Sequence, residues 1–504
     1  MPLFGPFALV DLLVLGLYFA AIGGIAWRMG KPERDSEDFI VGGRQVPWPA
    51  VLLSVMATEI SAVTFLAVTG TGFESNLTYL QFGIGSIAGR VVVAIIFLRA
   101  YYATRCLTVY GYLAIRFGET TRYTATGVFL ISRLVAAAIR LSLAAIGFHV
   151  LLDIPFLWTL GAFTLVAIAY TSWGGIKAVI WTDVVQAVVF IGGGLAAFLW
   201  IGAEIGFGNI FSTAGESDKL TLLRLAPEAG ASQPWWNDAG LFYLAFVNGF
   251  VMIIASLGTD QDLTQRLLTC KRVGEAQRSV ILSGVFGIPV AALFLLVGLA
   301  IYAYARLHPE WLLPVNAEGV VQSSQVFAAF IRDVLPAGLR GLLVAGIFAS
   351  AMSSIDSAMS ALASSAMSDL YRPLIRRNAS ERHYLGVARI GVAVFGILLL
   401  LIAWSVRDTP NFLWLALGVA GIPAGTLLGI FLLGLTTRRG NDRWNLAAMA
   451  SGLLLSTILF TAIRMEWIGL AWPWIVIIGT SWTFAIGFLG KAPAACAETD
   501  SPHS

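Results

Sequence analysis

Long apolar stretches, separated by short polar segments, fill almost the whole chain of 504 residues. A helix needs about 20 mostly apolar residues to cross a bilayer. Stretches of roughly this length lie near residues 7–27, 48–71, 77–98, 123–152, 155–172, 174–201, 238–257, 280–305, 338–369, 384–406, 411–436, 444–463 and 470–490. The pattern predicts an all-α polytopic membrane protein with thirteen transmembrane helices in one lipid bilayer.

Basic residues in the connections predict the orientation of these helices. Arginine and lysine gather in every second connection, as at Arg28 and Lys31 and again at Arg376 and Arg377. The long connections near 202–237 and 307–337 hold few of them. Because short cytoplasmic loops carry an excess of positive residues, the N-terminus is expected outside and the C-terminus inside.

Composition narrows the class of protein further. Hydrophobic residues make up 58% of the chain and charged residues 12%, with a net charge of +3. No basic patch indicates a nucleic-acid partner, and no CxxC spacing indicates a disulfide or zinc site. We expect residues 1–491 to form a single transmembrane domain, followed by a short cytoplasmic tail at 492–504. No constellation of nucleophile and base indicates an enzyme, and no obligate protein partner is evident.

Three predicted helices carry a carboxylate, which is costly in a bilayer and therefore points to a partner or a function. These residues are Glu59, Asp183 and Asp356. Each could instead lie nearer the membrane interface, or be protonated and hydrogen-bonded without a function. Their occurrence on three separate helices favours a functional role.

One predicted helix also carries a face of serines. Ser350, Ser353, Ser354 and Ser357 fall at positions i, i+3, i+4 and i+7, which share one side of a helix. Hydroxyl oxygens and the free carbonyls of a helix break are hard ligands suited to Na⁺. The alternative is close helix packing through small residues.

Three segments resemble the sodium/solute symporters, a family that includes the sodium-glucose, proline, pantothenate, iodide and sialic acid carriers. They read "FIVGGRQVPWPAVLLSVMAT" at 39–58, "YTSWGGIKAVIWTDVVQ" at 170–186 and "GTDQDLTQRLLTCKR" at 258–272. The resemblance implies a leucine-transporter-type fold with a 5+5 inverted repeat, the repeats covering about 48–201 and 238–436. Extra helices would lie at about 7–27 and 444–490, and the second and seventh helices would be broken at the midplane.

The resemblance also implies sodium ligands. The shared sodium site would use the carbonyls of Ala57 and Ile60 with the side chains of Ser350, Ser353 and Ser354. A second sodium site would place Asp183 next to Asp356 and Ser357. The branch that uses a second sodium has a serine where this chain has Asp356, so a second Na⁺, a proton or a hydrogen bond could fill that place. Two adjacent carboxylates cannot both stay ionised without a cation between them.

The solute is less well specified by the sequence. Arg133 aligns with the arginine that binds the substrate carboxylate in the sialic acid branch, and an arginine fork suits that task. Alternatively, Arg133 or Arg140 pairs with Glu59 or with a backbone carbonyl. Further cavity positions implied by the relatives are Glu59, Ser61, Thr64, Gln81 and Asn248. Because Glu59 departs from the sialic acid carriers, an amino acid with its amine on Glu59 is equally consistent.

The function implied by the resemblance is secondary active transport. Inward sodium flow would drive uptake of a small organic solute, such as sialic acid, another organic acid or an amino acid, by alternating access. The expected location is the plasma membrane of a bacterium, its inner membrane. A proton-coupled or uncoupled carrier on the same scaffold is the alternative, and a non-transporting membrane sensor is a further one.

Overall fold

The computed structural model describes residues 7–29, 35–60, 62–152, 154–227, 234–316, 319–407 and 412–491. These residues form helices, with a single β-bridge between Val315 and Val321 and no strand. The prediction of an all-α protein is therefore confirmed. The predicted tail at 492–504 lies outside the described residues.

The first half of the chain is divided into helices that follow most of the predicted spans. Their bounds are α1 Leu9–Met29, α2 Ser36–Val41, η1 Gly42–Arg44, α3 Trp48–Glu59, α4 Ala62–Glu74, η2 Leu77–Tyr79, α5 Leu80–Val92, η3 Val93–Phe97, α6 Leu98–Thr104, α7 Val109–Arg116, α8 Glu119–Leu152 and α9 Phe156–Ile205.

The second half continues in the same way. Its elements are α10 Phe207–Glu216, η4 Trp235–Asn237, α11 Phe242–Thr259, α12 Gln261–Leu267, α13 Val273–Leu307, α14 Ser323–Asp333, α15 Leu339–Ser365, η5 Ala366–Ile375, α16 Glu381–Val406, α17 Phe412–Thr436, α18 Asp442–Arg464 and α19 Trp474–Phe488.

By length and composition, nine helices of the described residues could each cross a membrane. One of them, α9, covers two predicted spans, 155–172 and 174–201. Inside it, Gly175 has φ 49° and ψ −150°, a conformation that breaks the helical path and that glycine adopts at little cost. The Gly174–Gly175 pair therefore separates the two predicted spans.

The second and seventh predicted helices are each interrupted, as the family resemblance implied, although the second interruption lies just past the end of the predicted span 238–257. The first interruption follows Glu59, where Ile60 has φ −85° and ψ 83° before α4 begins at Ala62. The second lies at Asp260, with φ −89° and ψ 119°, between α11 and α12. The carboxylate of Asp260 accepts a hydrogen bond of 2.9 Å from the Asp262 amide and so caps α12. Each break leaves backbone groups free to bind something other than the helix itself.

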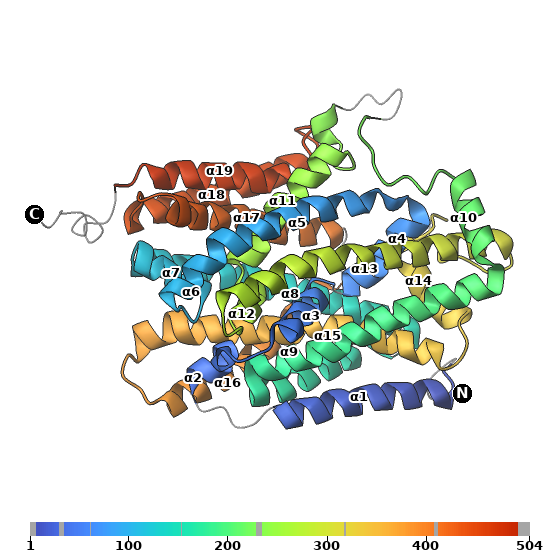
Figure 1. Ribbon diagram of the computed structural model, residues 1–504, viewed down its shortest axis with the longest axis horizontal. Helices are drawn as coiled ribbons and strands as arrows, with labels where there is room; N and C mark the ends of the chain where they lie inside the picture. Colours follow the sequence, from blue (N-terminus) through green and yellow to red (C-terminus); the bar gives the residue numbers. More distant parts are fainter. Residues whose placement is uncertain are drawn as a thin grey trace, which may run out of the picture.

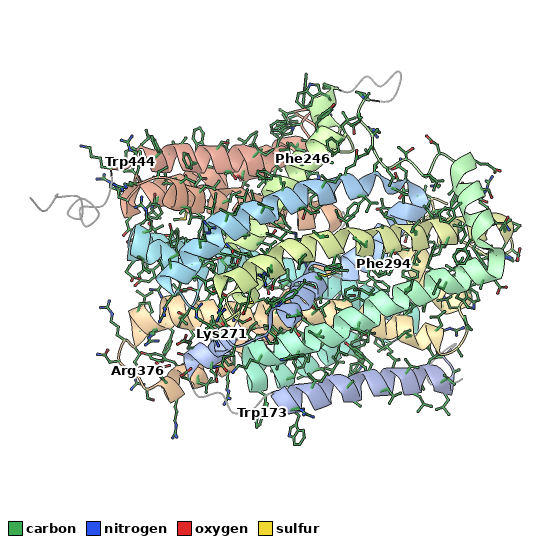
Figure 2. The ribbon with its side chains drawn as sticks, viewed as in Figure 1. Trp173, Phe246, Lys271, Phe294, Arg376 and Trp444 are labelled. Carbon is green, nitrogen blue, oxygen red and sulfur yellow. The ribbon has the colours of Figure 1, made fainter. Side chains whose placement is uncertain are left out.

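The helices run roughly along the long axis of the molecule, with α1 at one edge and α18 and α19 at the opposite edge (Figure 1). Between these edges, α15 is almost entirely buried, and it packs against α9, α8, α16 and α1. Its alanines, serines and glycines let neighbouring backbones approach closely. Phe294 also lies inside the bundle, whereas Arg376 and Trp444 lie at its left-hand end (Figure 2).

Close backbone contact also joins α13 to α4, the second half of the interrupted helix. A Cβ atom added at Gly298 would lie 2.0 Å from the carbonyl oxygen of Thr69. Side-chain rotation cannot relieve a clash with backbone, so α13 and α4 would have to move apart.

We therefore expect Gly298→Ala to destabilise the protein by about 1–3 kcal/mol, the usual cost of overpacking. The measurement is the thermal unfolding midpoint of the detergent-purified protein. Gly192→Ala is the control, because no atom lies within 4 Å of the position its Cβ would take. Equal midpoints for the two variants would contradict the close packing of α13 on α4.

Candidate functional site

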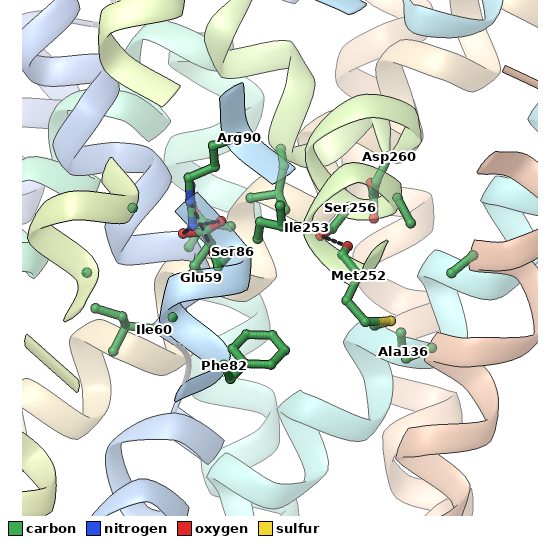
Figure 3. A pocket seen from close by; sticks show the side chains of 18 of the residues that line it. Glu59, Ile60, Phe82, Ser86, Arg90, Ala136, Met252, Ile253, Ser256 and Asp260 are labelled. Atoms are coloured by element: carbon green, nitrogen blue, oxygen red, sulfur yellow. Dashed lines mark hydrogen bonds and ion pairs between the residues drawn. The ribbon is translucent and has the colours of Figure 1, made fainter. Parts of the chain in front are cut away.

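A cavity of about 370 Å³ lies beside both helix breaks. Its lining includes Glu59 and Ile60 at the first break and Thr259 and Asp260 at the second. Glu59 and Asp260 lie on different sides of this space (Figure 3). Helices α5, α8, α11, α13 and α17 supply most of the other lining residues, and the lining reaches Tyr79 at the partly exposed turn between α4 and α5.

On one wall, Glu59 forms an ion pair with Arg90 of α5. A terminal nitrogen of Arg90 contacts both carboxylate oxygens, at 2.7 and 2.9 Å (Figure 3). The guanidinium also donates to Ser86 at 3.3 Å and to Ser283 at 2.7 Å. Gly284 makes room for it, since a Cβ there would lie 2.4 Å from Cδ of Arg90.

The alternative that Arg133 or Arg140 pairs with Glu59 is therefore wrong. Arg90 is a residue of the site that the sequence analysis missed. An arginine inside the predicted span 77–98 was itself a signal of a functional site.

On another wall, two aspartates hold Arg133 of α8. One terminal nitrogen lies 3.2 Å from Asp260, and the other contacts Asp262. The remaining donor, Nε, is buried and has no hydrogen-bond partner in the described part of the chain. Arg133 lines the cavity, and Arg140, two turns further along α8, lines it as well.

From Asp262, a chain of ion pairs continues away from the cavity. Asp262 accepts from Arg266 at 3.0 Å, and Arg266 donates to Asp183 at 3.1 and 3.3 Å. The side chains of these three residues are fully buried. Arg266 is the second site residue that was missed, although it belongs to the quoted segment 258–272.

Hydroxyl groups complete the surroundings of Asp183. Ser54 of α3 donates to one carboxylate oxygen at 2.5 Å, and Ser353 of α15 donates to the other at 2.6 Å. Asp183 thus joins α9 to α3, α12 and α15. Its burial is possible because a guanidinium neutralises it and donors satisfy both of its oxygens.

Asp356 was expected to face Asp183, but the two carboxylates have separate partners. Asp356 accepts hydrogen bonds from the Tyr170 hydroxyl and, at 2.5 Å, from the Ser357 amide. The hydroxyl of Ser357 lies 3.4 Å from Asp262. Hydrogen bonds thus reach both oxygens of Asp356, and the choice between a second Na⁺, a proton and a hydrogen bond at this place stays a prediction.

The serine face of α15 lies against the end of α3, near the first helix break. Ser353 lies 3.4 Å from Thr58, the residue that follows Ala57. Ser350 and Ser354 donate to the carbonyls of Ile347 and Ser350, at 2.9 and 3.4 Å. These hydroxyls keep oxygen lone pairs for a cation.

Two further expected solute contacts, Gln81 and Asn248, do not line the cavity. Gln81 donates to the Thr78 and Gly240 carbonyls and accepts from the Arg224 amide, so it holds the connection before α11. Neither Gln81 nor Asn248 of α11 is among the lining residues. Ser61 and the side chain of Thr64 lie outside the described residues.

Known proteins share this architecture. The sodium/sialic acid symporter SiaT of Proteus mirabilis is 28% identical over 466 residues, which cover 91% of this chain and 90% of that protein. A solved structure of the substrate-bound, outward-open state of a Na⁺-coupled sialic acid symporter matches with a TM-score of 0.85 and 26% identity, covering 97% and 99% of the two chains. The structure of MhsT in complex with L-phenylalanine matches in fold alone, with a TM-score of 0.50 and 13% identity, covering 87% of this chain and 97% of that chain.

These likenesses give the chain a leucine-transporter-type fold. The sequence model of the sodium:solute symporter family matches residues 39–452 of this chain. This range includes both helix breaks, the buried ion pairs and the serine face. The chain belongs to the sodium:solute symporter family.

Proposed function

We propose that this symporter couples the inward flow of sodium to the uptake of a small organic solute by alternating access. The observation that carries the proposal is the contact between the serine face of α15 and the end of α3, where the helix break frees backbone carbonyls. The two sialic acid symporters named above are sodium-coupled, which supports sodium as the driving ion.

The shared sodium site would combine carbonyls of Ala57 and Ile60 with hydroxyls of Ser350, Ser353 and Ser354. Ala57 and the three serines are buried to within 1% exposure, so a cation there would be shielded from bulk water. A dry site of neutral oxygens suits Na⁺ because it replaces a hydration shell without demanding strong charge. The interruption between α3 and α4 lines the cavity through Glu59 and Ile60, which supports a sodium site next to the solute.

A second sodium at Asp183, Asp356 and Ser357 faces an obstacle. Arg266 already neutralises Asp183, and Tyr170 already donates to Asp356. A second ion would have to displace at least one of these donors. The geometry supports one sodium at the shared site while this chain of ion pairs is intact.

In our proposal the protein has thirteen spans in the inner membrane of a bacterium, with the N-terminus outside and the C-terminus inside. A straight helix of 50 residues would measure about 75 Å, more than twice the hydrocarbon thickness, so α9 counts as two spans. Arg376 and the start of α18 at Trp444 lie at one end of the bundle (Figure 2). Basic residues follow α15 and precede α18, which supports a cytoplasmic location of this end. Residues 1–491 form the transport domain in this proposal.

The solute in this proposal carries a carboxylate, as sialic acid, another organic acid or an amino acid would. Arginines line the cavity on α5 and α8, and their planar forks suit a carboxylate. Arg133 is the position implied by the resemblance. Its two aspartate partners leave it Nε as the donor for such a contact.

If the serine face binds sodium, Ser354→Ala should raise the half-saturating sodium concentration roughly tenfold, the equivalent of about 1.4 kcal/mol. The measurement is solute uptake into proteoliposomes as a function of external sodium. Ser360→Ala is the matched control, because Ser360 is buried on the same helix and its hydroxyl has no partner among the described residues. An unchanged sodium dependence in Ser354→Ala would place the ion elsewhere.

The buried pair of Asp183 and Arg266 gives a second test. Asp183→Asn leaves the guanidinium without its counter-charge and should cost about 3–5 kcal/mol of stability. Adding Arg266→Gln removes the stranded charge, while Asp262 keeps its pairing with Arg133. The double variant should therefore unfold at a higher temperature than Asp183→Asn alone. Additive losses in this double-mutant cycle would show that the two side chains do not interact.

A further inference from the structure

One charged side chain that lines the cavity lacks a partner. Five charged side chains contribute to its lining, and they are Glu59, Arg90, Arg133, Arg140 and Asp260. Glu59 pairs with Arg90 at 2.7 Å, and Arg133 pairs with Asp260 at 3.2 Å. Arg140 makes no ion pair or hydrogen bond within the described part of the chain. Asp262, just behind the lining, is a second partner of Arg133. Arg140 is thus the one charged side chain of this lining that lacks a partner among the described residues.

Arg140 is directed to the cavity by the helical repeat of α8. The lining residues of this helix are Phe129, Ser132, Arg133, Ala136 and Arg140, at positions i, i+3, i+4, i+7 and i+11. This spacing is a single stripe along a helix. Seven residues separate the two arginines, so Arg140 lies about 10 Å along the axis from Arg133. Both guanidinium groups therefore belong to the same wall.

The two arginines differ in what they can offer a carboxylate. Asp260 and Asp262 occupy the terminal nitrogens of Arg133, so Nε is its remaining donor. A bidentate contact needs two parallel N–H groups of one guanidinium. Arg140 has its whole fork free for that contact, and its side chain is partly exposed on the cavity side of α8.

The hydroxyl groups around the cavity add a second constraint. Ser132, Ser256 and Thr259 line it, and each donates its hydrogen to a backbone carbonyl of its own helix, at 3.1, 2.7 and 2.7 Å. A hydroxyl that has used its hydrogen offers only acceptor lone pairs. A ligand that satisfies these oxygens must bring its own O–H or N–H donors.

We propose that Arg140 binds the carboxylate of the transported solute, and that the solute is a hydroxylated organic anion without a free amine. This inference rests on the proposed function of solute uptake and specifies its substrate class. The carboxylate of an anion gives Arg140 a counter-charge, which a neutral sugar cannot supply. A zwitterion would also bring an ammonium group, and both carboxylates of the lining are already paired with arginines. Glu59 does not need an amine of the solute as its counter-charge, because Arg90 already neutralises it.

Uptake of four radiolabelled probes into proteoliposomes with an inward sodium gradient tests the substrate class. Sialic acid and gluconate are hydroxylated anions, glucose is the neutral counterpart of gluconate, and alanine is a small zwitterion. We expect accumulation of at least one of the two anions and of neither glucose nor alanine. Accumulation of glucose or alanine, or of none of the four probes, overturns the assignment.

Variants at the two arginines test the residue. Removing a charged hydrogen-bonding partner should raise KM for the accumulated anion about 10- to 100-fold in Arg140→Gln. Arg140→Lys should raise it less, because the charge remains, and Arg133→Lys should leave KM less affected than Arg140→Gln does. Arg464→Gln, at the exposed end of α18, is the control for loss of a cation.

Thermal unfolding midpoints of the purified variants show that they are folded. The half-saturating sodium concentration should stay the same in Arg140→Gln, since the serine face is intact. An unchanged KM in Arg140→Gln overturns the role of Arg140. Sodium-independent accumulation of an anion that still requires Arg140 would instead refute sodium coupling and leave the carboxylate contact standing.

Discussion

A buried row of alternating charges connects the centre of this protein. Arg133, Asp262, Arg266 and Asp183 follow one another from the cavity to the serine face, on helices α8, α12 and α9. In a medium of low dielectric constant, none of them can lose its partner without a large penalty. A rearrangement at one end therefore favours a rearrangement at the other, which is the physical requirement for coupling an ion to a solute.

The sequence predicted the parts of this arrangement that depend on position along a helix. Apolar length predicted the spans, family motifs predicted both breaks, and helical spacing predicted the serine face. The partners of Glu59, Asp183 and Asp356 were not predicted, because they depend on how each helix is rotated against its neighbours. Arg90 lies 31 residues from Glu59, and Arg266 lies 83 residues from Asp183, so no local pattern relates the members of either pair.

Gln81 illustrates the same limit at the edge of the cavity. It was expected to contact the solute, yet it binds the connection between α10 and α11 through Gly240 and Arg224. Lys219 strengthens this attachment by donating to the carbonyls of Phe73, Glu74 and Ser75, at 2.8, 2.9 and 3.0 Å, at the end of α4. A cation at a helix C-terminus satisfies exposed carbonyls and opposes the helix dipole. The long connection is thereby fixed to the interrupted helix beside the cavity.

Gly284 has no side chain, and this has an evolutionary consequence. Arg90 occupies the space that a Cβ at this position would need, and Glu59 relies on Arg90 for its counter-charge. An alanine at position 284 would displace the Arg90 guanidinium and leave the Glu59 carboxylate without its counter-charge. Glycine, arginine and glutamate at these three sites should consequently be inherited as a unit, gained or lost together as descendants of an ancestral carrier diverge toward different nutrients.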